Sequence, residues 1–402
     1  MNSEQSRTKK ERTEKRRPVT LFGAATLWMV VSLLMMAEPA GAQTLETEAV
    51  PSTRAQEPLQ VAWLIEDQKR PAAPIRSLPY TEPERSSWAL AIDNDYLALG
   101  GKDQDYTYGF NFTYTGRSAK DGWLSLDAPL GWLDSALGFE HLSPVGVSKH
   151  SREAGLFGFT PSEIEVVQPQ YGDRPYAGLV YLANSRERLD IRNRVAWKST
   201  LTVGVLGLDL VGDVQNESHA ILGSTPARGW DNQISDGGEL TARYTVARQH
   251  HVATLFDNLE IKSTVQGSVG YLTEASWSLS VRGGDYHTAW SSFNPELVSY
   301  GEKSSYTNSG ISVDEHYFWG GVSVKARAYN AFLQGQFRDS EVTFERSELR
   351  SVMLEAWLGY TVAFAEGYRI SYVVRGHSSE IKQGPGDRNL LWGGLILART
   401  FR

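Results

Sequence analysis

The chain has 402 residues, no cysteine and more acidic than basic side chains, which gives a formal net charge of −7. Without cysteine it has no disulfide, no thiol nucleophile, no Cys-ligated zinc site and no lipid-modified N-terminal cysteine. A net acidic protein is also a poor candidate for general binding of nucleic acid.

The N-terminal segment predicts export. Seven basic residues lie between Arg7 and Arg17, an apolar stretch follows over 21–37, and Ala40-Gly41-Ala42 provides small residues for cleavage. We interpret residues 1–42 as a signal peptide, with a retained membrane anchor as the alternative. Cleavage leaves a mature chain with a net charge of about −10. Residues 43–85 are rich in Pro, Glu and Ala and predict a flexible leader.

Residues 86–402 are predicted to form one domain built from strands. In the segment Tyr106–Thr115 every even position is aromatic and every odd position is small or polar. This period of two predicts a strand with one apolar and one wet face, and an aromatic outer face is typical of a lipid-facing barrel. Further strand-like segments cover 88–93, 179–183, 201–211, 262–272, 277–282, 317–335, 352–365, 368–376 and 390–401.

Charge alternates with apolar residues in several of these segments, as where Val324 is followed by Lys325 and Ala326 by Arg327. This pattern suits a polar lumen behind a lipid-facing wall. No apolar run after the signal peptide is long enough for a transmembrane helix. We therefore predict an all-β protein, a single antiparallel transmembrane β-barrel of about 12 strands in the bacterial outer membrane. A water-soluble β-sandwich is the alternative, and the oligomeric state stays open.

An acidic loop precedes the aromatic strand and contains Asp93, Asn94, Asp95, Asp103 and Asp105. Carboxylate and amide oxygens are the ligands that Ca²⁺ prefers, although Asn and Asp are equally common in plain turns. In the alternating pattern Thr107 is expected to face the lumen close to this loop. Its simplest role there is a polar residue that fills the lumen.

His219 stands apart among eight histidines because of its surroundings, VGDVQNESHAILGSTPARGWDNQ. Gln215 precedes it by four residues, so the two side chains share a face if the segment is helical. Asp213 and Glu217 are close enough in sequence to orient an imidazole, which suits a general base. The segment GDRPYAG at 172–178 is either a structural turn or a binding element.

Together these segments resemble the outer-membrane lipid A 3′-O-deacylase family. The resemblance rests on Asn94-Asp95, on DYTYG at 105–109, on GDRPYAG, and on VQNESH at 214–219 followed by Gly229-Trp230 and Gln233. It implies a twelve-stranded barrel with an active site in the lumen near the outer rim. It also implies calcium-dependent removal of the 3′-linked acyloxyacyl chain from lipid A of lipopolysaccharide.

By this resemblance His219 is the catalytic histidine and general base. Asn94, Thr107 and Gln215 are the surrounding catalytic-site residues, and Asp95 with Asn94 is expected to bind Ca²⁺. The chain departs from the family in two places. No carboxylate closely follows His219, so that Asp231, Asp236 or Glu239 would have to replace it, and no lysine precedes GDR between residues 160 and 172. The alternatives are a non-catalytic barrel, porin-like or an inactive relative, and an outer-membrane phospholipid esterase.

Overall fold

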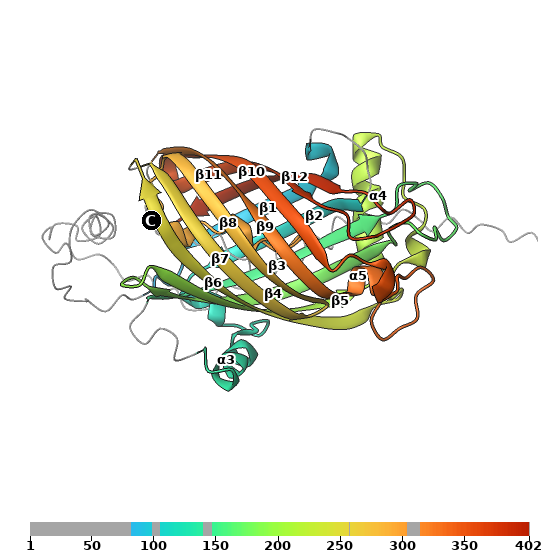
Figure 1. Cartoon of the computed structure of the whole chain (residues 1–402), viewed down its shortest axis with the longest axis horizontal. Helices are drawn as coiled ribbons and strands as arrows, with labels where there is room; N and C mark the ends of the chain where they lie inside the picture. Colours follow the sequence, from blue (N-terminus) through green and yellow to red (C-terminus); the bar gives the residue numbers. More distant parts are fainter. Residues whose placement is uncertain (1–81, 99–104, 140–146, 257, 304–313, 402) are drawn as a thin grey trace, which may run out of the picture. The chain divides into compact units, whose positions relative to one another are not determined.

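The computed structural model describes residues 82–98, 105–139, 147–256, 258–303 and 314–401 (Figure 1). The predicted signal peptide, most of the predicted leader and Asp103 lie outside these ranges. No helix in the described ranges is long and apolar enough to span a membrane.

Within the described ranges, twelve antiparallel strands close into a barrel in which β1 pairs with both β2 and β12. This confirms the predicted fold class. The strands are β1 (Ser87–Asn94), β2 (Asp105–Thr115), β3 (Val147–Thr160), β4 (Ala177–Asp190), β5 (Val195–Leu206), β6 (Glu239–Leu255), β7 (Leu259–Gly270), β8 (Leu272–Asp285), β9 (Glu315–Asn330), β10 (Val352–Phe364), β11 (Tyr368–His377) and β12 (Leu390–Thr400).

Helical segments connect some of the strands. The α-helices are α3 (Asp127–Ala136), α4 (Asp209–Leu222) and α5 (Ala331–Gln334), and short 3-10 turns are η1 (Asp95–Leu97), η2 (Arg117–Lys120), η4 (Trp230–Asn232), η5 (Trp290–Ser292), η6 (Pro295–Leu297), η7 (Arg346–Glu348) and η8 (Ala365–Gly367). The predicted strand 201–211 was too long, because α4 begins at Asp209. The predicted strand 317–335 likewise ran into α5.

The strands alternate between a polar inner face and an apolar outer face, as predicted. Lys325 of β9 forms an ion pair with Glu355 of β10 at 2.5 Å inside the barrel. On the outer face, Val322 is 55% exposed and Leu358 is 65% exposed. Pairing between opposite charges makes the buried lumen tolerable, since an isolated buried charge is costly.

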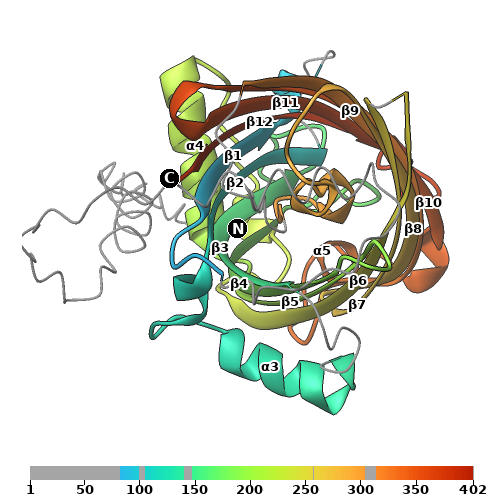
Figure 2. The same ribbon diagram turned by 90° about the vertical axis from the view of Figure 1, so that its left-hand side faces the viewer.

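Residues 286–303, between β8 and β9, pass through the lumen, where Figure 2 shows them inside the ring of strands. Lys149 donates to the Ser292 hydroxyl at 3.0 Å, and Tyr181 donates to the Gly301 carbonyl oxygen at 3.0 Å. Lys303 forms a buried ion pair with Asp93 of β1. We call this segment the lumen plug.

The two ends of the barrel differ in their connections. Short turns at 191–194 and 365–367 lie at the end where β1 begins and β12 ends, and two longer connections at this end carry α3 and the lumen plug. The opposite end carries α4, α5 and further loops (Figure 1). Outer-membrane barrels have short periplasmic turns and longer extracellular loops. We therefore interpret the end that carries α4 as the extracellular rim.

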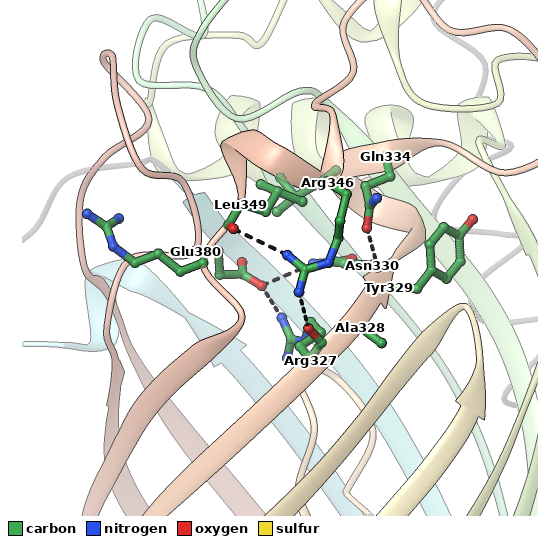
Figure 3. A pocket seen from close by; sticks show the side chains of 10 residues that line it. Arg327, Ala328, Tyr329, Asn330, Gln334, Arg346, Leu349 and Glu380 are labelled. Atoms are coloured by element: carbon green, nitrogen blue, oxygen red, sulfur yellow. Dashed lines mark hydrogen bonds and ion pairs between the residues drawn. The ribbon is translucent and has the colours of Figure 1, made fainter.

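Ion pairs join the extracellular loops above the lumen. Glu380 accepts from Arg174 at 2.5 Å. It also pairs with Arg327, and Arg346 donates to the Arg327 carbonyl oxygen at 3.0 Å (Figure 3). The small pocket in Figure 3 is lined largely by these mutually bonded groups and lies at β9, across the ring from β3. We interpret it as structural.

Candidate active site on the outer wall

A β-bulge in β2 decides which residues face the membrane. Tyr106 pairs with Phe159 and Tyr108 with Gly158, so Thr107 is the extra residue. Tyr106 turns inward, is 1% exposed and packs on Trp392 with ring centroids 5.0 Å apart. This corrects the prediction that Tyr106 belongs to the outer aromatic face.

The bulge also corrects the prediction that Thr107 faces the lumen. The Thr107 hydroxyl lies 2.6 Å from the Thr160 hydroxyl. Thr160 follows Phe159, which packs inside the barrel, so alternation places Thr160 on the outer face. Thr107 is therefore on the outer face as well.

Asn94 and Asp95 lie next to Thr107 at the same rim. Asn94 continues the outward positions of β1 after Ile92, which is 47% exposed, and its Nδ2 donates to the Thr107 carbonyl oxygen at 2.9 Å. The Tyr96 N–H donates to Asn94 Oδ1 at 2.7 Å and to Asp95 Oδ1 at 2.9 Å. Asp95 is 3% exposed.

The other described acids of the predicted loop bind basic side chains elsewhere. Asp93 faces inward and binds Lys303, and Asp105 binds Arg174 and Arg388 at 3.3 and 2.8 Å. Of the described loop residues, Asn94 and Asp95 are thus the ones grouped with Thr107.

Helix α4 packs on the outside of the barrel, against β3 and β4 (Figure 2). Glycines make room for it, since a Cβ at Gly178 would lie 2.7 Å from the Val211 side chain and one at Gly158 would lie 3.0 Å from it. The Tyr108 hydroxyl donates to the Val211 carbonyl oxygen. The expected location in the lumen is therefore wrong, and the candidate site lies on the membrane side of the wall.

Gln215 and His219 both lie on the buried face of α4, as their spacing predicted. His219 is 6% exposed, and its Nδ1 lies 2.5 Å from the Thr225 carbonyl oxygen. A carbonyl oxygen only accepts, so Nδ1 carries the proton and Nε2 of the neutral ring is the basic nitrogen. Gly223 ends the helix with φ 71°, which turns the chain back and brings Thr225 to the ring.

Gln215 holds an unused donor. Its Oε1 accepts from the Trp230 indole N–H at 2.8 Å. Its Nε2 is buried and has no partner among the described residues. Because such a group costs about 1–3 kcal/mol, the arrangement indicates a place for a water or a ligand oxygen.

The candidate replacements for the missing carboxylate have other partners or stand exposed. Glu239 accepts from the Ser235 hydroxyl at 2.6 Å and from the Phe337 N–H at 2.8 Å. Asp231 and Asp236 are exposed, and Asp236 accepts from Gln233 at 3.2 Å. The Thr225 carbonyl group is one contact that orients His219.

The GDRPYAG segment is a structural turn beside the site. Asp173 accepts from the Ser162 N–H and hydroxyl at 2.9 and 2.7 Å. Burial raises the pKa of Asp173, but the Ser162 hydrogen bonds and the Arg388 guanidinium outweigh it, so the pKa lies below its ordinary value. Tyr176 packs on Trp230 with ring centroids 5.0 Å apart, and thus supports the partner of Gln215.

The structure therefore brings the predicted residues together in two groups. Asn94, Asp95 and Thr107 form one group at the strand ends, and Gln215 and His219 form the other on α4. Tyr108 links the groups through Val211. Sequence reasoning missed Tyr108 and the Thr225 carbonyl, since a long-range contact and a backbone oxygen leave no pattern in a sequence.

Few side-chain oxygen atoms are available to bind a metal ion at this rim. The described ranges hold no cluster of three or more His, Cys, Asp and Glu residues suited to a metal ion. Asp95 offers one buried carboxylate and Asn94 one amide oxygen. Ca²⁺ also accepts backbone carbonyl and water oxygens, so this donor set fits a Ca²⁺ that completes its coordination with such ligands.

Comparison with known proteins gives the following matches. A family profile described as "Outer membrane protein LpxR" matches residues 29–401. The solved structure of LpxR from Salmonella typhimurium is similar over 79% of this chain and 100% of that chain, with a TM-score of 0.60 and 17% identity. The KdgM porin matches over 79% of this chain and 99% of that chain, with a TM-score of 0.34 and 4% identity. No curated protein sequence matches the chain.

Proposed function

Because the chain belongs to the LpxR family of lipid A-modifying outer membrane proteins, we propose that it is an ester hydrolase that removes the 3′-linked acyloxyacyl chain from lipid A. The observation that carries the proposal is the pairing of an oriented His219 with the unused Gln215 donor on one buried helix face.

The position of the site supports a membrane lipid as substrate. The site lies outside the barrel at the extracellular rim, between α4 and the strands that face the membrane. Lipopolysaccharide occupies the outer leaflet at this level. A lipid can therefore reach His219 by diffusing in the plane of the membrane, without entering the lumen.

In the proposed reaction, His219 Nε2 takes a proton from a water molecule, and the water oxygen attacks the ester carbonyl carbon. The tetrahedral intermediate then collapses, and the bond between the acyl carbon and the 3′ oxygen breaks. The imidazolium of His219 returns its proton to the departing 3′ oxygen. The Gln215 amide donates to the water or to a substrate oxygen and so positions the reactants.

Asp95 and Asn94 are the residues that would hold Ca²⁺ at this rim. A cation bound there supplies Lewis-acid polarisation of an ester carbonyl group. Thr107 holds Asn94 through its carbonyl oxygen and thereby keeps these oxygens at the strand ends.

A porin function is disfavoured by the lumen plug. The plug bonds to Lys149 and Tyr181 on the inner wall and to Asp93 through Lys303. A channel of this kind would have to expel a segment that is anchored at several points. Planar bilayers containing the protein are expected to show no stable single-channel conductance.

The direct test is a mass spectrum of lipid A from cells with and without the protein. We expect the loss of one acyloxyacyl unit from lipid A in cells that contain it. Purified protein incubated with lipid A and phospholipid side by side should release acyl chains from lipid A alone. Unchanged lipid A, or release only from phospholipid, would contradict the proposal.

A further inference from the structure

Helix α3 buries both of its acids against the barrel, together with Leu130, and exposes Trp132 on its outward side. Asp127 and Asp134 are buried, at 8% and 1% exposed. Trp132 is 69% exposed, and the flanking Trp123 and Leu137 are 81% and 58% exposed. A helix on the surface of a water-soluble domain usually turns its acids toward the solvent and its large aromatic residues toward the core.

Polar groups of the outer wall hold the helix in place. Arg186 of β4 donates to both carboxylate oxygens of Asp127, at 2.8 and 2.6 Å. Asp134 accepts from the Ser199 hydroxyl and the Tyr244 hydroxyl, each at 2.8 Å. Lipid would otherwise meet these wall groups directly, which is unfavourable for polar side chains on the outside of a barrel.

The helix lies on the half of the wall toward the periplasm. Arg186 and Ser199 are register partners that lie close to the 191–194 turn joining β4 and β5. Figure 2 shows α3 outside the ring of strands. Because α3 packs on the outer face of β4 and β5, its exposed apolar side chains lie on the same outer surface of the barrel as Val265 and Trp277, which are 54% and 49% exposed.

We propose that α3 is an interfacial helix that inserts Trp123, Trp132 and Leu137 into the phospholipid leaflet on the periplasmic side of the outer membrane. Tryptophan is enriched at membrane interfaces, and helices with one apolar face lie in the interface plane. In this arrangement the acids of α3 bind the polar wall residues Arg186, Ser199 and Tyr244 and cover them from lipid. The outward side chains of α3 then form the apolar surface that lipid contacts.

The absence of cysteine in the chain makes the proposal directly testable. Trp132→Cys introduces one labelling site on the outward face of α3, and Arg192→Cys introduces a matched site in the exposed turn between β4 and β5. Each full-length variant is labelled with an environment-sensitive dye and reconstituted in phosphatidylethanolamine–phosphatidylglycerol vesicles. Phospholipids that carry a quencher at shallow or deep acyl positions are added in parallel series.

For Trp132→Cys we expect a blue-shifted emission and quenching that is stronger from the shallow position than from the deep one. For Arg192→Cys we expect a water-like emission and little quenching. Equal, water-like behaviour of both variants would overturn the proposal. So would a blue shift of the label at 132 that appears only as the protein-to-lipid ratio rises and comes without quenching by the lipids, because this result would assign the face to a second copy of the chain.

Discussion

Replacement of His219 by alanine should lower the rate of lipid A deacylation by about 10²–10⁴-fold, the usual contribution of a general base. This factor corresponds to about 2.7–5.4 kcal/mol of lost transition-state stabilisation. The same change should have a small effect on folding. It removes the hydrogen bond to the Thr225 carbonyl oxygen, worth about 1 kcal/mol, and alanine favours the helix more than histidine does.

The assay measures the rate at which acyl chains leave lipid A in detergent micelles, by mass spectrometry of timed samples. His219→Gln serves as a second variant, since its amide keeps a donor near Thr225 but supplies no base. Ser218→Ala is the matched control on the same turn, because Ser218 is exposed and its hydroxyl only donates to the Val214 carbonyl oxygen.

The reasoning fails if His219→Ala and His219→Gln retain the rate of Ser218→Ala while all three barrels are folded. Folding is checked by heat-dependent mobility in gels and by circular dichroism. A result in which alanine is inactive and glutamine is fully active would assign His219 a role in hydrogen bonding rather than in proton transfer.

Three further changes test other parts of the structure. Gly178→Val should push Val211 and α4 away from the wall and lower the rate by about tenfold or more, because a misplacement of about 1 Å can cost about 10²-fold. Removal of Ca²⁺ with a chelator should abolish deacylation reversibly without unfolding the barrel, and Asp95→Asn should raise the Ca²⁺ concentration needed for half-maximal rate. Lys303→Met should leave Asp93 buried with the Tyr106 hydroxyl but without its cationic partner, and lower the free energy of unfolding, measured in urea, by about 3–5 kcal/mol.

Each of these changes has its own control. Gly267→Val adds the same side chain at an outward position with no atom within 4 Å of its Cβ, so equal rates in both glycine variants would argue against the role of α4 packing. Mg²⁺ should not restore the chelated protein, because it prefers six closely spaced oxygen ligands. Lys382→Met changes an exposed lysine, and a similar loss of stability there would remove the special role of Lys303.

Residue pattern alone was enough to predict the barrel and the faces of most strands. In β10 and most of β9 exposed and buried residues alternate, because one face of each strand meets lipid and the other meets the interior of the barrel. Strands β3 and β6 were both missed, and in β3 the glycines at 155 and 158 interrupt the pattern. Gly158 is a glycine because Val211 of α4 packs on it.

The candidate site was predicted in its residues but not in its location. The spacing of Gln215 and His219 already places both on one helix face, because this relation is local. The side of the wall on which they lie depends on where α4 packs, which is a long-range matter. No pattern in the sequence predicts the lumen plug either, because its buried residues, such as Trp290 and Phe293, do not recur with a regular spacing.

Thr107, the extra residue in β2, determines which polar groups the outer wall presents at this rim. It lets Tyr106 face the interior while Tyr108 faces outward, and its carbonyl oxygen accepts from Asn94. Deleting Thr107 would leave Tyr106 and Tyr108 on the faces they now occupy, but it would remove this contact between β1 and β2. A single inserted residue therefore gives the outer surface a polar anchor that a regular strand would lack.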